Sequence, residues 1–302
     1  MDVFLQQLFN GLFLGAIYAL IALGYTMVYG ILRFINFAHG EIYMVGAFTG
    51  YFMAGWLLNA VGLDPGWIIL ILVLLVSMVT CALLGVAIEW LVYRPLRNRP
   101  RLTVLITAIG VSLFLQYGGQ SWLGAAPRAF PTLLPKTSLS LGPVQATNLQ
   151  VVVLVITGIL ILALRFFVMK TRLGKAMRAV SHNVQAASLM GINNDRVITV
   201  TFAVGSALAA AAGVLYAINY PTINPLMGLM PGLKAFVAAV LGGIGSIPGA
   251  AVGGLVLGVV ETFAGGSTFL SPYRDAIAFG LLVLLLLFKP GGLMGKATVE
   301  KV

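Results

Sequence analysis

One polar, basic stretch decides how this chain is organised: KTRLGKAMRAVSHNVQAASLMGINNDRVITVTF, residues 170–202. It interrupts an otherwise apolar sequence and lies between two apolar segments, which predicts a cytoplasmic connector between membrane spans. Within it, residues 175–190 predict a short helix, with Gly174 as its start and Gly191 as its stop. The apolar residues of that helix gather toward one side: Met177, Val180, Val184, Ala187 and Leu189.

Two interpretations of this connector are open. A short helix on the inner membrane surface that exposes polar side chains suits docking into a groove of another protein. The exposed set is Ser181, His182, Asn183 and Gln185. Basic inner loops are also what orients any multi-span membrane protein, and such loops often lie flat as interfacial helices.

The composition places the chain among polytopic α-helical membrane proteins. Of its 302 residues, 60% are hydrophobic and 9% charged, with a mean hydropathy of +1.03, whereas soluble domains carry roughly 25% charged residues. Spans of about 20 residues with their connectors allow on the order of eight to ten crossings. We therefore expect one membrane bundle over residues 1–302. The first apolar run lacks a basic leader, so we expect it to remain as a helix.

The net charge of +10 has a topological explanation. Basic residues cluster in three short segments: Arg94, Arg97, Arg99 and Arg101; Arg165, Lys170, Arg172, Lys175, Arg178 and Arg196; Lys289, Lys296 and Lys301. This is the positive-inside pattern of a membrane protein. With Arg33 also inside, we expect a periplasmic N-terminus and a cytoplasmic C-terminus, with the lipid bilayer rather than nucleic acid as the partner of these charges.

About eight or nine transmembrane helices are predicted. The spans are 4–32, 42–60, 67–93, 102–123, 148–169, 197–219, a segment ending near Glu261, and 276–288. Residues 232–247 are short and Gly-rich for a crossing, and predict a re-entrant segment or half-helix. The Pro-containing segments 124–147 and 220–231 are expected to be outer loops, the first without regular structure.

Small residues at spacings of four predict close helix packing. Gly11 and Gly15 form such a pair in the first span. Two interleaved series follow near the C-terminus: Gly242, Ser246, Ala250, Gly254, Gly258, and Gly245, Gly249, Gly253. A helix with two such faces can pack against two neighbouring backbones at once.

Ionisable groups within or beside the spans are the candidates for a substrate path. A charged side chain there costs roughly 2.5 to 3.5 kcal/mol on insertion scales, so its presence needs a reason. The path candidates are Tyr18, Tyr25, Asn36, His39, Glu41 and Glu261. The tyrosines are also ordinary packing residues, and Glu41 is also a helix-capping residue. Glu89 and Lys234 are expected to be structural groups that reach the interfaces.

Motifs for enzyme chemistry are absent from the sequence. No phosphate-binding GxxxxGK[ST] loop occurs, so the chain is not expected to hydrolyse ATP. His39 and His182 have no ligand partners at metal-binding spacing, so neither a metal site nor a cofactor bound by this chain is expected. Cys81 is the single cysteine, which excludes a disulfide within the chain.

Several motifs in order along the chain carry a resemblance to a known family. They are INFAHGE at residues 35–41, MGIN at 190–193, KAF at 234–236, and AVLGGIGSIPGA at 239–250. Together they resemble the permeases of bacterial branched-chain amino acid ABC transporters, and most closely the smaller of the two permeases of such a system. Residues 185–191, QAASLMG, are similar to the EAAxxxG coupling loop of ABC permeases, with Gln185 in place of the usual Glu and without the IxLP that often follows.

The resemblance implies a five-part importer in the bacterial inner membrane. Its other parts would be a homologous second permease, two ATP-binding subunits that hold ATP and Mg, and a periplasmic substrate-binding protein that delivers leucine, isoleucine or valine to residues 221–231. The residues implied to couple to the ATPase subunits are Gly174, Arg178, His182, Gln185, Ala186, Ala187 and Gly191. Related permeases for urea, amides and other neutral amino acids share these motifs, so the substrate stays open.

Two other classes of function remain. A secondary carrier or channel acting alone would use the Gly-rich broken segment and the intramembrane carboxylates, and would couple to protons through Glu41 or Glu261. A membrane enzyme has only His39 and Glu41 in its favour, without the nucleophile, base and orienting group that such a site needs.

Overall fold

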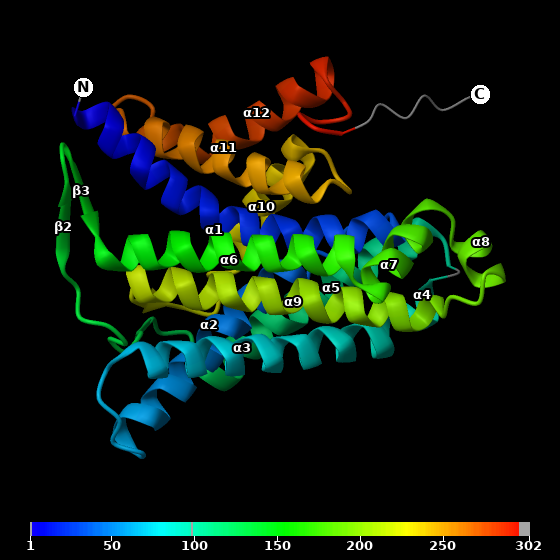
Figure 1. Ribbon diagram of the computed structural model, residues 1–302, viewed down its shortest axis with the longest axis horizontal. Coiled ribbons are helices and arrows are strands. Elements are labelled where there is room, and N and C mark those ends of the chain that lie inside the picture. The colour runs from blue at the N-terminus through cyan, green and yellow to red at the C-terminus, as the bar shows by residue number, and fades with distance from the viewer. Residues whose placement is uncertain (1, 98, 296–302) are drawn as a thin grey trace.

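The computed structural model describes residues 2–97 and 99–295 and is a bundle of apolar helices (Figure 1). Its helices are α1 (Asp2–Leu32), α2 (His39–Asn59), α3 (Trp67–Ile88), the π-helical turn η1 (Glu89–Tyr93), α4 (Arg94–Leu96), α5 (Arg101–Leu123), α6 (Asn148–Lys170), α7 (Arg172–His182), α8 (Val184–Leu189), α9 (Asn194–Asn219), α10 (Leu229–Gly242), α11 (Ile247–Gly266), the 3₁₀ turn η2 (Ser271–Tyr273) and α12 (Arg274–Phe288). The strands are β1 (Arg128–Ala129), β2 (Ser138–Leu141), β3 (Val144–Thr147) and β4 (Thr222–Ile223).

The predicted class, an all-α polytopic membrane protein, is confirmed. Within the described residues, seven helices are long and apolar enough to cross a membrane: α1, α3 with η1 and α4, α5, α6, α9, α11, and α12 with η2. The remaining two predicted segments are α2, with 21 residues, and α10, with only 14. At 1.5 Å per residue, α10 is about 21 Å long, which is shorter than a hydrocarbon core of about 30 Å.

The core of the bundle is built around α1. Most of α1 and α9 is buried, whereas α5, α6 and α12 present most of their surface outward. Gly residues bring α1 and α11 together: Gly15 lies against the backbone of Leu255, and Gly258 against the backbone of Gly15. The contact between these helices is therefore backbone on backbone, which only small residues permit.

The second small-residue face of α11 packs on α10. Gly249 lies against Gly242, and Gly253 against Ala238. Gly245 differs from the other glycines of its series, because it lies in the turn between α10 and α11 with a φ of +93°, and a Cβ there would meet no atom within 4 Å. Its role is conformational, since that backbone geometry favours glycine.

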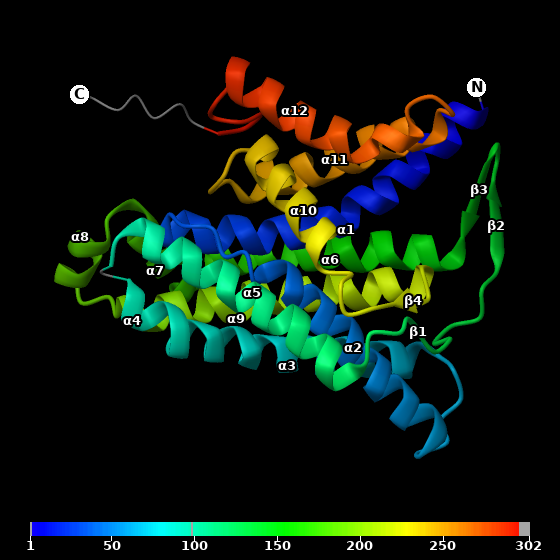
Figure 2. The same ribbon diagram turned by 180° about the vertical axis from the view of Figure 1, so that it is seen from behind.

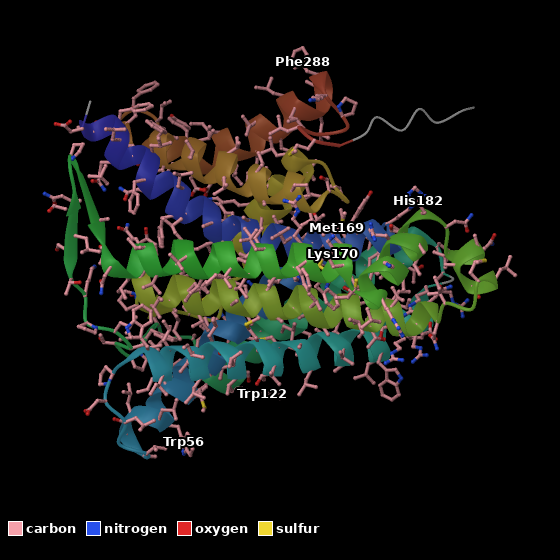
Figure 3. All side chains as sticks on the ribbon, in the orientation of Figure 1. Trp56, Trp122, Met169, Lys170, His182 and Phe288 are labelled. Carbon is pink, nitrogen blue, oxygen red and sulfur yellow. The ribbon has the colours of Figure 1, made fainter. Side chains whose placement is uncertain are left out.

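The two ends of the bundle differ in character. One end, called here the hairpin end, carries the start of α1 and the β2–β3 hairpin, and the opposite end, called the α8 end, carries α4, α7 and α8 (Figure 1). Trp56 and Trp122 lie near where α2 and α5 finish at the hairpin end, while Lys170 and His182 lie at the α8 end (Figure 3). Exposed tryptophans near helix ends are typical of membrane–water interfaces.

One segment of the bundle consists of a non-helical stretch followed by a short helix. After α9 the chain runs without helix from Tyr220 to Gly228, and then α10 runs obliquely across the bundle (Figure 2). Gly228 packs against the Gly40 carbonyl, at the first turn of α2. The half-helix predicted at 232–247 is therefore present, but it begins at Leu229 and ends at Gly242.

The expectation that residues 220–231 form a loop was wrong in part. Ile223 and Pro225 are buried, β4 pairs with β1, and the last residues of the segment belong to α10. The prolines that indicated a loop are compatible with this structure, because an extended backbone and a first helical turn both accept proline.

The expectation of no regular structure over 124–147 was also wrong. β2 and β3 form an antiparallel hairpin in which Leu141 pairs with Val144 across the turn Gly142-Pro143. Gly142 has a φ of +63°, and a glycine at the first central position is what a two-residue hairpin turn uses. The Gly142-Pro143 pair was the available signal.

The connector at the α8 end contains two helices instead of one. Thr171 caps α7 by accepting a hydrogen bond from the backbone N–H of Gly174 at 3.0 Å, and Asn183 breaks the helix and caps α8 through two more. Gly191 follows with a φ of +80°, which confirms it as the stop. Because the helix breaks, its apolar residues do not share one face: Met177, Val180 and Ala187 are buried, whereas Val184 and Leu189 are exposed.

Candidate functional site

A cavity of about 470 Å³, called here the central cavity, is lined by residues of α1, α2, α9, α10, α11 and α12 and of the non-helical segment before α10. Its polar lining includes Tyr18, Tyr43, Tyr216, Asn224, Lys234 and Glu261, with Arg274 beside them. Its apolar lining includes Leu14, Ile17, Leu226, Met227 and Met230. A volume of this size is within the range of small-molecule sites, which are mostly apolar with a few placed polar groups.

Four side chains form an ion-paired network at this cavity, and we call them the Lys234 network: Tyr18, Lys234 and Glu261 line the cavity, and Asp275 contacts Lys234 from outside the lining. The ammonium group of Lys234 lies 2.6 Å from Glu261 Oε1 and 2.6 Å from Asp275 Oδ1. The hydroxyl of Tyr18 donates a hydrogen bond to Glu261 Oε2 at 2.8 Å. Lys234 and Glu261 are each only 7% exposed, so the pair is stable only because both charges are compensated.

The network is assembled from four helices, α1, α10, α11 and α12. Lys234 stands on the half-helix α10 and lies beside Glu261 of α11. Asp275 comes from the first turn of α12 and has a side chain that is 51% exposed. The network therefore runs from a buried position in α10 to an exposed one in α12.

A second hollow of about 340 Å³ adjoins the central cavity. The two share Leu14, Tyr220, Glu261 and Arg274 as lining residues. Asn10, Gln150 and Thr262 add polar groups to the second hollow. Glu261 and Arg274 consequently stand on the boundary between the two spaces.

The other predicted path residues lie apart from the lining of the central cavity. The rings of Tyr25 and His39 pack edge to face at 4.7 Å. Asn36 Oδ1 accepts a hydrogen bond from the Tyr93 hydroxyl at 2.7 Å. All three of Asn36, His39 and Glu41 are buried, and the structure places them in packed contacts between helices.

Glu41 occupies a buried polar contact between α2 and α5. Its Oε1 accepts a hydrogen bond from the Ser112 hydroxyl at 3.5 Å, and it forms no salt bridge with any residue that the structure describes. Glu41 also lies close to the backbone of Gly228, where α10 begins. The start of a helix carries partial positive charge, which favours an acidic group there.

Lys234 is the functional candidate that sequence reasoning set aside as structural. It could not be placed beside Glu261 without knowing that α10 and α11 fold back on each other. The signal that could have found it is the second Gly series of α11, since a face that packs on the preceding segment brings residues near 234 to residues near 261. Arg274 and Asp275 gave no comparable signal.

The α8 end presents a surface made of the coupling candidates. Arg178, His182, Gln185, Ala186 and Gly191 are exposed, and Gly174 and Ala187 are buried beneath them. Leu189 and Met190 are 89% and 82% exposed, which is unusual for apolar side chains of this size at the end of a short helix. In Figure 3, His182 lies with this segment, beyond the end of α6 marked by Lys170.

An ion cluster beside this surface joins the start of α9 to η1 and to the loop after α4. Asp195, in the first turn of α9, pairs with Arg94 and Arg97. Arg97 also pairs with Glu89, which is fully buried in the π-helical turn η1 and accepts a hydrogen bond from the Thr199 hydroxyl at 2.7 Å. The sequence expectation placed Glu89 at an interface, but burial and full pairing make it a fixed link between α3 and α9.

Two further expectations concern metals and the basic tail. Among the residues that the structure describes, no group of three or more acidic, histidine or cysteine side chains could hold a metal ion. Cys81 is a buried free cysteine. Lys296 and Lys301 lie outside the described residues.

A bundle of apolar helices around an ion-paired cavity, with a half-helix beside it, defines a membrane transport protein. A family model described as "Branched-chain amino acid transport system / permease component" matches residues 7–286. The chain belongs to this family of branched-chain amino acid transport permeases.

Several named relatives match this chain over nearly its whole length. It is 47% identical to the high-affinity branched-chain amino acid transport system permease protein BraD of Pseudomonas aeruginosa, over 99% of this chain and 98% of the relative. It is 47% identical to the corresponding protein LivH of Escherichia coli K12 over the same shares. The autoinducer 2 import system permease protein LsrC of Yersinia pestis is 29% identical over 99% of this chain and 81% of the relative. No solved structure matches the chain.

Proposed function

We propose that this chain is the membrane subunit of an ATP-driven importer that moves leucine, isoleucine, valine or related neutral amino acids into the bacterial cytoplasm. It acts with a homologous second permease, two ATP-binding subunits and a periplasmic substrate-binding protein. The family assignment and the full-length relatives support the substrate class. The observation that supports the mechanism is the exposed α8, which is joined to the start of α9 by a hydrogen bond from the Asn194 side-chain amide to the Val184 carbonyl at 3.0 Å.

In this proposal the α8 end is cytoplasmic and the hairpin end is periplasmic. The basic residues of α4, α7 and the start of α9 gather at the α8 end, as the positive-inside rule requires for a cytoplasmic face. The ATP-binding subunits then receive α8, and the substrate-binding protein docks at the hairpin end, where the N-terminus also lies. The membrane is the inner membrane of the bacterium.

Docking at α8 is coupled to the cavity through the chain itself. When an ATP-binding subunit moves α8, α9 moves with it, because Asn194, the first residue of α9, donates a side-chain hydrogen bond to the carbonyl of Val184 in α8 at 3.0 Å. α9 carries Tyr216 on the wall of the central cavity and continues into the non-helical segment that leads to α10. A shift of α9 therefore changes the cavity lining at Tyr216.

The test is to replace exposed apolar residues of α8 and to measure assembly. Leu189→Asp and Met190→Asp should abolish co-purification of the ATP-binding subunits from native membranes, and uptake of leucine should fall with it. Leu139→Asp is the matched control, because Leu139 is an exposed apolar residue of the hairpin at the opposite end. Unchanged co-purification in the α8 variants would exclude this surface as the docking site.

The competing function, a secondary carrier acting alone, has its own test. The purified chain in proteoliposomes should not move leucine unless the second permease and the ATP-binding subunits are present with ATP. Leucine uptake by the chain alone, driven by a proton gradient, would establish the carrier and remove the proposal.

A further inference from the structure

We propose that the Lys234 network, with Arg274, recognises the ammonium and carboxylate groups of a zwitterionic amino acid, and that it selects against solutes lacking either charge. This rests on the proposed function, because it assigns the substrate class of the same path. No family resemblance or relative assigns a role to these residues. The inference is carried by the charges, burial and lining of the central cavity.

The network contains charges that can be exchanged with a ligand. Lys234 is shared between two carboxylates at the same distance of 2.6 Å, so it can release one and remain paired with the other. Asp275 is half exposed and is thereby free to leave Lys234 for a ligand ammonium. Arg274 also lines the cavity and forms no salt bridge within the described residues. A carboxylate could then bind Arg274 and the released side of Lys234.

Charge balance selects the class of ligand. A zwitterion brings one charge of each sign, so each group displaced from an ion pair gains a new partner. An uncharged solute such as urea or an amide offers no charged partner to Lys234, Arg274 or Asp275, and a singly charged solute pairs with only one sign of charge in the network. Leaving a buried charge unpaired is strongly unfavourable, and a site built to bind a polar group rejects analogues that lack it.

The lining beside the network fits an aliphatic side chain. Leu14, Ile17 and Met230 line the same cavity as Lys234 and Glu261. Burial of a branched aliphatic group against such a surface is favourable in proportion to the apolar area removed from water. The cavity thus combines a polar wall for the main-chain groups with an apolar wall for the side chain.

The contacts of the network allow its role in recognition to be tested separately from a structural role. Tyr18 holds Glu261 through a hydrogen bond that does not involve Lys234, so the position of Glu261 does not depend on the ion pair alone. A double variant that removes both charges at once, Lys234→Met with Glu261→Gln, leaves neither of these two groups charged and unpaired. We expect it to assemble, which makes its transport behaviour informative.

The first experiment uses the complete importer in proteoliposomes. The double variant Lys234→Met/Glu261→Gln should retain ATPase stimulation by the docked substrate-binding protein, while leucine uptake per ATP falls by about tenfold to a hundredfold, the range expected for lost charged hydrogen bonds. Thr201→Val is the control, since this buried hydroxyl bonds only to its own helix backbone. Uptake at the wild-type level in the double variant would overturn the proposal.

A second variant covers a failure of the double variant to assemble. Asp275→Asn changes an exposed member of the network and should reduce leucine uptake per ATP with ATPase stimulation intact. Retained uptake here would count against recognition by the network in the same way.

The second experiment measures recognition without the substrate-binding protein. A cysteine at Thr222, an exposed residue of the cavity lining, is labelled with a maleimide in the purified permease–ATPase complex, and the buried Cys81 stays unlabelled. L-leucine at millimolar concentration should slow labelling, whereas leucinamide and 4-methylpentanoate at the same concentration should not. Equal protection by all three compounds, or protection by none, would contradict the proposal.

The two levels of inference fail in distinguishable ways. If the wild-type complex shows no ATP-dependent leucine uptake, the proposed function itself fails. If the wild-type complex transports leucine and the double variant does so equally well, only the role of the Lys234 network is lost.

Discussion

At the scale of single residues, certain glycines allow the helices of the bundle to approach each other closely. A Cβ on Gly258 would lie 2.2 Å from the backbone nitrogen of Gly15, whereas one on Gly280 of α12 would meet no atom within 4 Å. Replacement by alanine should therefore produce a clash at Gly258 and be tolerated at Gly280, although both glycines lie in apolar helices. The reason is that backbone atoms, unlike long side chains, cannot move aside.

Gly258→Ala should destabilise the folded protein by about 1–3 kcal/mol, the usual cost of overpacking a close contact. The measurement is the midpoint of thermal unfolding in detergent, followed by loss of monodisperse protein. Gly280→Ala, the matched control, should leave the midpoint unchanged. Equal midpoints for the two variants would show that α1 and α11 are not in backbone contact.

The hydroxyl of Tyr18 provides the second residue-scale prediction. Tyr18→Phe removes the donor to Glu261 Oε2, and a hydrogen bond to a charged group is worth about 1.5–3 kcal/mol. We expect a lower unfolding midpoint and weaker leucine uptake. Tyr29→Phe, on the same helix, should have little effect because the Tyr29 hydroxyl makes no hydrogen bond with the residues that the structure describes. A wild-type phenotype for Tyr18→Phe would remove Tyr18 from the site.

At the scale of elements, the ion cluster at the α8 end fixes how α3 and α9 move together. Arg97→Met would leave Glu89 buried without its cation, and breaking a buried pair by removing one partner costs about 3–5 kcal/mol. Expression and thermal stability should both fall. The double variant Arg97→Met/Glu89→Gln should recover most of the loss, because no unpaired carboxylate remains.

Arg99→Met is the control for this prediction, since Arg99 is an exposed residue of the same loop. If Arg97→Met is no less stable than Arg99→Met, the Glu89 pair contributes nothing to the link between the two helices.

The cap of α8 gives a second element-scale prediction. Asn183 Oδ1 accepts hydrogen bonds from the backbone N–H groups of Gln185 and Ala186 at 2.9 and 3.0 Å. Asn183→Ala should destabilise this six-residue helix by about 0.5–2 kcal/mol and weaken binding of the ATP-binding subunits accordingly. Asn183→Asp preserves the cap and should bind normally. Similar binding by both variants would show that α8 does not dock as a helix.

At the scale of the whole molecule, the orientation of the bundle can be tested with single cysteines. Ser140, in the hairpin, should be labelled from the periplasm by a membrane-impermeant maleimide when replaced by cysteine, and Ser188, in α8, should be labelled only after the membrane is opened. The native Cys81 is buried and adds no background. The reverse pattern would invert the proposed topology, and with it the side on which the ATP-binding subunits dock.

Much of the architecture followed from composition and spacing. The class, the run of spans and the half-helix near 232–247 depend on local hydropathy and small-residue periodicity, which are properties of a single segment. The stop at Gly191 was equally local, since its positive φ needs glycine. Where a residue type dictates the backbone geometry, the local structure could be predicted from the sequence.

Features that depend on contacts between two distant segments could not be predicted from local sequence. Asn183 broke the predicted helix because its side chain accepts hydrogen bonds from the backbone N–H groups of Gln185 and Ala186, which replace those of a continuing turn. Lys234 gained its partners only through the antiparallel return of α11, and Asp275 through the turn before α12. The path candidates Tyr18 and Glu261 lie together on the cavity wall, whereas Asn36, His39 and Glu41 lie in separate packed contacts.

The half-helix also has a consequence for the order in which the chain is synthesised. The carbonyl groups of Leu241 and Gly242, at the end of α10, accept hydrogen bonds from the backbone N–H groups of Leu293 and Met294 at 2.8 and 3.0 Å. Those partners emerge from the ribosome only after α11 and α12. The C-terminal end of the half-helix beside the cavity therefore lacks these hydrogen-bond partners until the final part of the described chain has been synthesised.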